Sequence, residues 1–411
     1  MNNKNKISSY INSYIKKKKK WINETPKRKT VFKDIKNISL ILISTFVVLV
    51  LWSNRINIAP ENVYLWIQEN IKSFGITSRF PVKIQGEKIQ TENLQINDKR
   101  LVALSDSSFD VFSKNGKELQ NEKHSFSNPN LQYSGLRYML FDRGGTSFKI
   151  ASDCGTLHCG TTEQKILTAT VASDGSYAIA TQSPRYLSEL QVFNKHNVLK
   201  FKIPFSEYYI TNVDINPYCE EIIVSGISSH GGDIVSNIYV IDPASQSIKS
   251  QFGLEDNMVT DLKYFSNGNF VAIGDKYCAF INPKTKLVTK KDYENNILKF
   301  YDFDKSGVLC LCLSSSENEC SKDIILKLDG SGKEIKLIKT NYSFNDIILK
   351  GSSVIGVTND KIISYNMWGG FDGYIKLEKH YRKILPAPHG YVYALNSCNV
   401  SKIKLSGFKR D

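Results

Sequence analysis

The sequence lacks the short motifs that identify common hydrolases and metalloenzymes. It contains no G-x-S-x-G, no H-E-x-x-H and no calcium loop of the D-x-D-x-D type, and its six histidines are dispersed. The stretch "GSGKE" at Gly330 lacks the spacer and the hydroxyl residue of a phosphate-binding loop, so we interpret it as a turn. We therefore predict no catalytic residue, no cofactor and no metal site, and an enzyme is not the favoured interpretation.

Cysteine is also scarce, and all eight cysteines lie in the part of the chain from Cys154 onwards. Cys154 and Cys159 bracket a short loop and are candidates for a local disulfide, which an oxidising exterior would permit. With His158 they resemble half of a zinc site, but no partner C-x-x-C exists, so zinc is not predicted. Cys310 and Cys312 alternate in an apolar stretch, which predicts buried thiols.

Only one long uncharged run interrupts this otherwise mixed sequence, from Ile38 to Trp52. As a helix, residues 37–53 reach about 25 Å, near the lower limit for crossing a bilayer. A buried core helix would show polar residues at helical spacing, and few occur here. We predict a transmembrane helix over 37–53, whose apolar residues are Ile38, Leu40, Ile41, Leu42, Ile43, Phe46, Val47, Val48, Leu49, Val50, Leu51 and Trp52.

Acidic residues are rare before this run. Residues 1–36 hold eleven lysines and one arginine against two acidic residues, which accounts for +10 of the net charge of +14. This bias predicts a cytoplasmic N-terminus and a C-terminal part outside the cell membrane. No A-x-A pattern follows the run, so we interpret it as an uncleaved signal-anchor. The basic charge then belongs to the tail and does not indicate nucleic acid.

The basic tail has two interpretations. Ile7, Ile11, Tyr14 and Ile15 fall on one helical face before the lysines at 16–20, which predicts an amphipathic helix on anionic lipids of the inner leaflet. The alternative is a tail without structure whose lysines only set the orientation.

Residues 54–79 are predicted to form a stalk helix and a linker. Pro60 suits the first position of a helix. Val63, Ile67 and Ile71 then form one apolar stripe. This helix either spaces the outer part of the chain from the lipid or packs beneath it.

From residue 80 to the end, short apolar strands and turns repeat. Glycines recur at a hairpin corner where a positive φ is needed: Gly135, Gly175, Gly268, Gly307, Gly351 and Gly390. Their spacings are 40 residues, then 93 across two units, then 39, 44 and 39. Four strands in about forty residues form the blade of a β-propeller.

The predicted fold class is all-β, a propeller of about eight four-stranded blades over 80–411, with seven blades as the alternative. Eight units fill Gln90–Leu405, but the last one supplies only about three strands. The segment "FPVKI" at Phe80–Ile84 is expected to complete the last blade and close the ring.

Several stretches resemble one known family. They are "APENVYLWI" at Ala59, "FPVKIQG" at Phe80, "FSNPNLQYS" at Phe126 and "LFDRGG" at Leu140. Together with one apolar run after a basic tail, they are similar to uncharacterised single-span propeller proteins of Gram-positive bacteria, known as a domain of unknown function. The resemblance covers nearly the whole chain. It implies the topology and the propeller, but it implies no activity and supplies no site residues.

Two stretches are candidates for ligand binding. "SSHGGD" at Ser228 is either a flexible loop whose His230 and Asp233 contact a ligand or a plain long connection. "MWGGFDGY" at Met367 places Trp368 and Phe371 in one corner, as an aromatic platform for a sugar or as packing residues.

The favoured function is a binding or scaffolding module of the cell envelope, tethered to the lipid bilayer by one span. Its expected partner is an envelope protein or a glycan. One alternative is an enzyme acting on cell-surface glycans, which would need two carboxylates about 5–10 Å apart in a cleft. Another is a sensor that couples the outer part to a cytoplasmic partner through the basic tail.

Overall fold

The structure is a computed structural model that describes residues 12–17, 26–53, 59–72, 79–97, 100–304, 307–315 and 322–410. The chain divides into two compact units, Met1–Ala59 and Pro60–Asp411. The first unit contains helix α2 (Pro26–Ser53), and the second contains helix α3 (Pro60–Lys72) and strands β1 to β32. Of the predicted amphipathic tail helix, residues 12–17 are described and helical; its other residues lie outside the described ranges.

The apolar run lies within α2. Its large apolar side chains are exposed, from 43% at Val50 to 68% at Trp52. Within the described part of the chain, no helix combines the length and the apolarity that a membrane span requires. The structure thus does not support the transmembrane helix predicted over 37–53.

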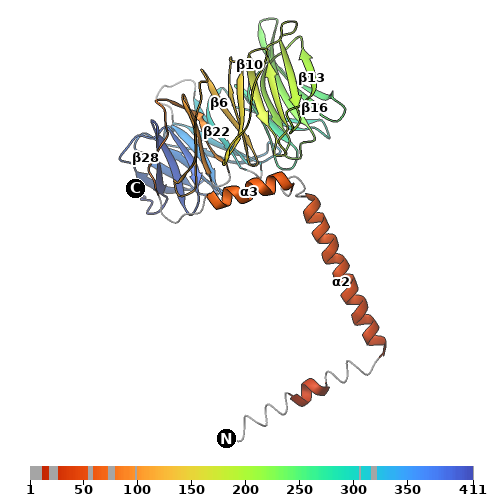
Figure 1. The fold of residues 1–411 in the computed structure, drawn as a ribbon. Helices are drawn as coiled ribbons and strands as arrows, with labels where there is room; N and C mark the ends of the chain where they lie inside the picture. The colour runs from red at the N-terminus through yellow and green to blue at the C-terminus, as the bar shows by residue number, and fades with distance from the viewer. Residues whose placement is uncertain are drawn as a thin grey trace. The chain divides into compact units, whose positions relative to one another are not determined.

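The strands form eight separate four-stranded antiparallel sheets, the blades of a propeller (Figure 1). Blade 1 contains β2 (Ile89–Asn97), β3 (Arg100–Ser105), β4 (Ser108–Phe112) and β5 (Glu118–Lys123). Blade 2 contains β6 (Pro129–Ser134), β7 (Arg137–Asp142), β8 (Ser147–Ser152) and β9 (Gly155–Thr161). Blade 3 contains β10 (Ile166–Val171), β11 (Tyr177–Thr181), β12 (Ser188–Phe193) and β13 (Leu199–Phe205). Blade 4 contains β14 (Tyr209–Ile215), β15 (Ile222–His230), β16 (Asp233–Asp242) and β17 (Ser247–Leu254).

The remaining blades follow the same order. Blade 5 contains β18 (Val259–Tyr264), β19 (Phe270–Gly274), β20 (Tyr277–Asn282) and β21 (Leu287–Asp292). Blade 6 contains β22 (Asn296–Phe303), β23 (Leu309–Ser315), β24 (Ile324–Leu328) and β25 (Glu334–Lys339). Blade 7 contains β26 (Asp346–Lys350), β27 (Ser353–Val357), β28 (Lys361–Tyr365) and β29 (Phe371–Lys376). Blade 8 contains β30 (Lys383–Ala387), β31 (Tyr391–Asn396), β32 (Asn399–Lys404) and β1 (Val82–Lys83).

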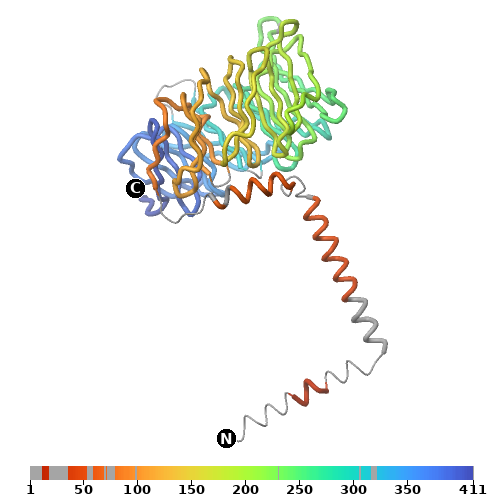
Figure 2. The backbone as a smooth tube through the Cα atoms, in the orientation of Figure 1, coloured from red at the N-terminus to blue at the C-terminus, as the bar shows by residue number. Residues whose placement is uncertain are grey.

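Blade 8 joins the two ends of the propeller. β1 pairs antiparallel with β32, and Val82 lies opposite Val400. Figure 2 shows the orange start of the propeller beside its blue end. This confirms that the segment Phe80–Ile84 closes the ring, and that the propeller has eight blades rather than seven.

The core of the propeller lies between the blades. Buried side chains form eight clusters, and each cluster joins two neighbouring blades. The cluster between blades 8 and 1 contains Val82, Leu101, Tyr393 and Val400. Because each sheet is covered on both sides, central strands such as β7 and β19 are buried at every position.

The antiparallel order gives the ring two different faces. The connections from first to second and from third to fourth strands lie on one face, which we name the turn face. The second-to-third and blade-to-blade connections lie on the opposite face, the loop face. The six glycines of the predicted corners lie on the turn face, and their φ angles of +57° to +94° confirm the turn assignment.

Helix α3 lies on the turn face (Figure 1). The Asn62 side chain accepts a hydrogen bond from Arg137 Nη1 at 2.6 Å and donates one to the Ser173 carbonyl at 3.2 Å. Glu61 forms an ion pair with Lys195 at 2.8 Å. The predicted stalk helix therefore packs beneath the propeller, held largely by polar contacts.

Candidate functional site

The first strands of the blades carry charged side chains that the repeat pattern does not require. First strands of neighbouring blades contact each other, as β10 does with β14 and β26 with β30. We name five residues within them the central polar set: Asp214 in β14, Asp261 and Lys263 in β18, Asp302 in β22 and Asp346 in β26. Since these groups come from four blades, they are the first candidate site.

Three of the carboxylates hold neighbouring blades together. Each one accepts the backbone N–H of the first strand of the next blade: Asp214 from Tyr264 at 3.0 Å, Asp302 from Leu349 at 2.7 Å, and Asp346 from Ile384 at 2.9 Å. Asn93 does the same between blades 1 and 2, where its side chain accepts from Leu131 N–H at 3.0 Å. These contacts satisfy backbone groups that face another sheet, so they stabilise the ring.

Two of these carboxyl groups have pKa values well above the usual range of aspartate. Burial raises the pKa of Asp302 to about 7 and the pKa of Asp346 to about 6. The hydrogen bonds accepted from backbone N–H groups lower both pKa values only in part. Such shifts occur in acid–base catalysts and in structural carboxylates alike. Here the geometry favours the structural role, because both groups bond to the adjacent blade.

Lys263 balances the negative charge of the set. Burial lowers the pKa of Lys263, but attraction to Asp214 and Asp261 outweighs it, and the net shift is upward. The Tyr301 hydroxyl donates a hydrogen bond to Asp261 Oδ2 at 3.0 Å. A lysine held as a cation does not act as a base. An enzyme acting on glycans needs two carboxylates that can contact the substrate. Three carboxylates of the central polar set bond to the neighbouring blade, and Asp261 accepts a hydrogen bond from Tyr301. The set therefore gives no support to this alternative.

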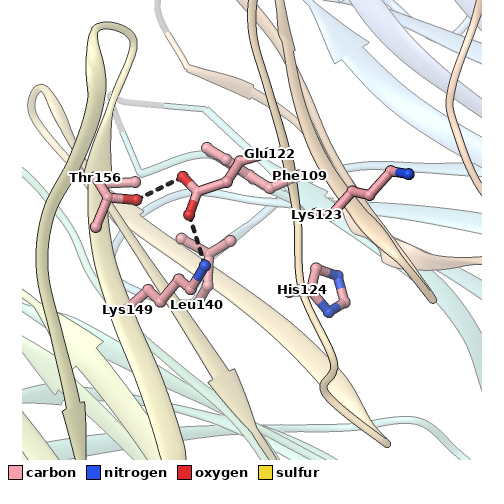
Figure 3. A pocket seen from close by; sticks show the side chains of 8 residues that line it. Phe109, Glu122, Lys123, His124, Leu140, Lys149 and Thr156 are labelled. Atoms are coloured by element: carbon pink, nitrogen blue, oxygen red, sulfur yellow. Dashed lines mark hydrogen bonds and ion pairs between the residues drawn. The ribbon is translucent and has the colours of Figure 1, made fainter.

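An open groove lies on the outer side of blades 1 and 2. Its volume is about 650 Å³, and Lys123, Phe126, Phe148 and Cys159 are among its lining residues. Figure 3 shows the adjoining small pocket, where Lys149 Nζ lies 2.5 Å from a Glu122 oxygen and the Thr156 hydroxyl donates to the other. The charges at this end of the groove are thus paired with each other.

His124, which also lines the groove, is held in one protonation state. Its Nδ1 accepts the Phe126 N–H at 3.2 Å, and its Nε2 lies 3.1 Å from the Ser105 carbonyl. These partners assign the proton to Nε2. Burial lowers the pKa of His124, in agreement with a neutral ring. The imidazole therefore fixes the connection after β5 and offers no nitrogen to a ligand.

The predicted binding loop at Ser228 is a regular hairpin. His230 pairs with Asp233, and Gly231 and Gly232 form the turn with φ of +63° and +99°. Two consecutive positive φ angles are those of a tight hairpin turn, which glycine permits. The stretch is therefore a tight turn and not a long connection, and ligand contact by His230 and Asp233 stays a prediction. The stretch is the tip of the β15–β16 hairpin, on the loop face.

The second candidate stretch divides into an exposed and a packed residue. Trp368, in the β28–β29 turn, is 75% exposed. Phe371 stacks on Tyr342, with ring centroids 6.2 Å apart, and meets Tyr365 edge-on. Phe371 thus serves the core between blades 6 and 7. The structure does not bring the four predicted residues together, because Trp368 lies on the turn face and the hairpin tip on the loop face.

The cysteines do not form the predicted disulfide. Cys154 and Cys159 are free thiols. Cys159 pairs with Lys149 within β9, whereas Cys154 lies in the turn before that strand, so five positions along extended chain separate the two thiols. Cys310 and Cys312 are fully buried, as predicted. Among the described residues, no cluster of histidine, cysteine and acidic side chains could hold a metal ion.

The central polar set was missed by sequence reasoning. The signal was present, because an aspartate occurs a few residues before the turn glycine in "TDLKYFSNG", "FYDFDKSG" and "NDIILKG". A charge inside an apolar strand indicates a buried partner. The partner itself could not be named, since it is a backbone group of a different blade.

Comparisons with solved structures agree with the propeller. Sqt1 of Saccharomyces cerevisiae is similar with a TM-score of 0.56 at 10% identity, over 80% of this chain and 100% of that one. BamB of Moraxella catarrhalis is similar with a TM-score of 0.52 at 9% identity, over 82% of this chain and 99% of that one. At such identities the likeness shows the fold alone.

Comparisons of sequence show the family. No curated protein matches the chain. Residues 78–405 match the Family of unknown function (DUF5711), and this range covers the propeller from just before β1 to just after β32. The chain therefore belongs to the DUF5711 family, a family of unknown function whose member here folds as an eight-bladed β-propeller.

Proposed function

We propose that this protein is a binding or scaffolding module that holds a protein partner on its loop face. The observation that carries the proposal is a group of exposed apolar side chains on blades 3 and 4. We name Tyr186, Leu187, Tyr209 and Ile234 the loop-face patch; they are 43%, 48%, 37% and 45% exposed. Tyrosine is one of the side chains that supply most of the binding energy at protein interfaces.

The register of blade 4 places two patch residues on one side of its sheet. Tyr209 pairs with Ile227, which in turn pairs with Ser236. Ile234 is two residues from Ser236 in β16 and so points to the same side. The side chain of Gln182 in blade 3 donates a hydrogen bond to the Tyr209 hydroxyl at 3.1 Å. The Ser236 hydroxyl donates to the Asn257 carbonyl at 2.7 Å, so this side of blade 4 faces blade 5, while the Tyr209 hydroxyl links the patch to blade 3.

Blade 3 supplies the other two residues of the patch. Tyr186 and Leu187 lie in its second-to-third connection, and the Leu187 N–H donates to the Phe205 carbonyl at 3.1 Å. The β15–β16 hairpin, built from strands of 9 and 10 residues, carries Ile234 next to its tip. Backbone hydrogen bonds hold both the hairpin and the Leu187 connection, and a surface held in place before binding lowers the entropy cost of binding.

The proposal includes a membrane anchor and an orientation. The apolar run of 37–53 has the composition of a span, and the net charge of +10 before it favours a cytoplasmic N-terminus. The propeller would then lie outside the cell membrane, and the lysines of the tail would contact anionic lipids of the inner leaflet. This anchoring keeps the loop-face patch at a high effective concentration near envelope proteins.

In-cell chemical cross-linking of the tagged full-length chain, analysed by mass spectrometry, tests the proposal. We expect propeller lysines to cross-link to a few defined envelope proteins. The double variant Tyr186→Ser and Ile234→Ser should lose these cross-links. A control, Leu287→Ser, removes an apolar residue that is 64% exposed from the outer strand of blade 5 and should keep them.

Two results would contradict the proposal. If the patch variant keeps the same partners as the control, the loop-face patch is not the binding surface. If propeller lysines cross-link to cytosolic proteins, the proposed orientation is wrong.

A further inference from the structure

Helix α3 exposes its apolar side. Asn62 and Leu65, which face the ring, are only 5% and 7% exposed. Tyr64, Ile67 and Ile71 are spaced by three and four residues and so form one stripe. At 100° per residue this stripe is centred opposite Asn62 and Leu65. An amphipathic helix on a soluble domain normally buries its apolar stripe, and this one does the reverse.

The exposure of the stripe is substantial. Tyr64 is 60% exposed, Ile67 46% and Ile71 71%, and Trp66, which lies outside the stripe at about 100° from Ile67, is 58% exposed. The polar contacts of Asn62 with Arg137 described above fix the helix in this orientation. Rotating the helix to bury the apolar stripe would break those hydrogen bonds. The folded structure therefore keeps the stripe exposed.

A second apolar group occurs on the same face. Trp368 and its neighbour Met367 project from the β28–β29 turn, which lies on the turn face like α3. Asn366 Oδ1 accepts the N–H groups of Trp368 and Gly370, both at 3.0 Å, so the turn that presents the indole is rigid. The two tryptophans that follow the apolar run, Trp66 and Trp368, thus both lie exposed on one face.

Exposed lysines lie on the same face of the ring as these aromatic residues. Exposed lysines occupy several turns between third and fourth strands on this face: Lys114 in blade 1, Lys284 and Lys286 in blade 5, and Lys333 in blade 6. Aspartates in third-to-fourth turns of this face accept backbone hydrogen bonds, as Asp242 of blade 4 does from Ala244 N–H and Asp329 of blade 6 from Ser331 N–H. Exposed tryptophan, tyrosine and lysine together are typical of surfaces that contact the interfacial region of a membrane.

Few residues separate α3 from the proposed anchor along the chain. The apolar run ends at Trp52, and α3 begins at Pro60. The short connection between them can span at most about 28 Å when fully extended. If the run crosses the membrane, α3 begins close to the bilayer surface.

We propose that the turn face rests on the lipid bilayer surface, with α3 as an interfacial helix and Trp368 as a second contact. This inference rests on the proposed anchoring and extends it. Apolar side chains of α3 enter the headgroup region. The lysines in the third-to-fourth turns of the turn face contact anionic lipid headgroups. The loop-face patch then points away from the membrane, toward partners.

Tryptophan fluorescence of the full-length chain in vesicles tests the inference. Vesicles contain phosphatidylcholine and phosphatidylglycerol, with or without brominated phospholipid as the quencher. Trp21→Phe and Trp52→Phe are introduced so that only Trp66 and Trp368 emit. We expect blue-shifted emission and quenching of about twofold or more, as for side chains at the interface. Adding Trp66→Phe or Trp368→Phe resolves the two contributions.

A matched reporter on the loop face is the control. In a chain without native tryptophans, Tyr186→Trp should emit as in water and resist the quencher. Co-flotation of the chain with the vesicles is recorded in parallel. If the chain does not co-float, the anchoring in the proposed function fails, and the inference fails with it.

Two further outcomes overturn the inference alone. The chain co-floats, but Trp66 and Trp368 emit as in water and are not quenched; the turn face then stays away from lipid. Alternatively both emissions are blue-shifted but insensitive to the brominated lipid, which means that protein covers the face instead.

Discussion

The turn face and the loop face of the same ring are built on different plans. On the turn face, the connections are short and repeat from blade to blade, with glycine at six first hairpins. On the loop face, the connections differ, and blade 4 extends the long β15–β16 hairpin. Turns of uniform length can form an even surface that contacts a flat partner such as a bilayer. Connections of different lengths can form a surface that is specific for one protein partner. This difference underlies the two proposals, lipid contact by the turn face and partner binding by the loop face.

The largest expected effect comes from opening the ring on which both faces depend. Val82→Asp places a charge at a buried position opposite Val400. We expect the free energy of unfolding to fall by more than about 4 kcal/mol. Urea unfolding followed by circular dichroism measures it. Lys83→Asp, one residue later on the exposed side of β1, is the control. Equal losses in both variants would mean that β1 does not close the ring.

The next effect concerns the groups that join blades between the two faces. The pKa of Asp302 is raised to about 7 from 3.8, so the folded state binds this proton more tightly than the unfolded state. The free energy of unfolding should therefore fall as pH rises from about 4 to about 7, by at most about 4 kcal/mol for this group. Above about pH 7 this contribution is constant.

Asp302→Asn keeps an acceptor for the Leu349 N–H and removes the titration. We expect a smaller loss of stability between pH 4 and pH 7, measured by urea unfolding across this range. The exposed control Glu163→Gln should keep the slope of the original chain. An unchanged slope in Asp302→Asn would show that this carboxyl is not buried as described.

A smaller effect is expected where α3 meets the turn face. Arg137→Ala removes the hydrogen bonds to Asn62 and to the Ser173 carbonyl and leaves the buried Asn62 side chain less satisfied. We expect a loss of about 2–3 kcal/mol in the local stability of α3. Hydrogen exchange of α3 amides should speed up accordingly, while the exchange of central strands stays slow. Arg185→Ala, on an exposed connection, should change neither.

The smallest stability effect is expected on the loop face. Ile234→Ser replaces an exposed side chain outside the core, so the free energy of unfolding should change by less than about 0.5 kcal/mol. Binding of a partner identified by cross-linking should weaken about tenfold or more. Thermal unfolding and a binding titration on the same sample separate the two. Weak binding with a large loss of stability would place Ile234 in the fold instead.

Much of the fold could be predicted because its signals are local. A glycine at a hairpin corner and apolar strands on either side are short-range patterns, and they recur once per blade. The three-stranded last unit also required a partner strand, which identified Phe80–Ile84 as the closing segment. The positions and contacts of the candidate binding residues were predicted less well. Trp368 and Phe371 look equivalent in sequence, yet Phe371 packs against Tyr342 of the preceding blade.

The sequence by itself therefore indicated a propeller of about eight blades, the closing strand and the positions of the turns, since these signals are local patterns that recur once per unit. The choice of eight blades over seven came from the pairing of β1 with β32. Only the tertiary structure decided which polar side chains form hydrogen bonds between neighbouring blades and which apolar side chains stay exposed to solvent. Asp302 meets the Leu349 N–H, and Asn62 meets Arg137, 75 positions away. Partners so distant are brought together only when the blades close into a ring, because side-chain exposure is a property of the assembled neighbours.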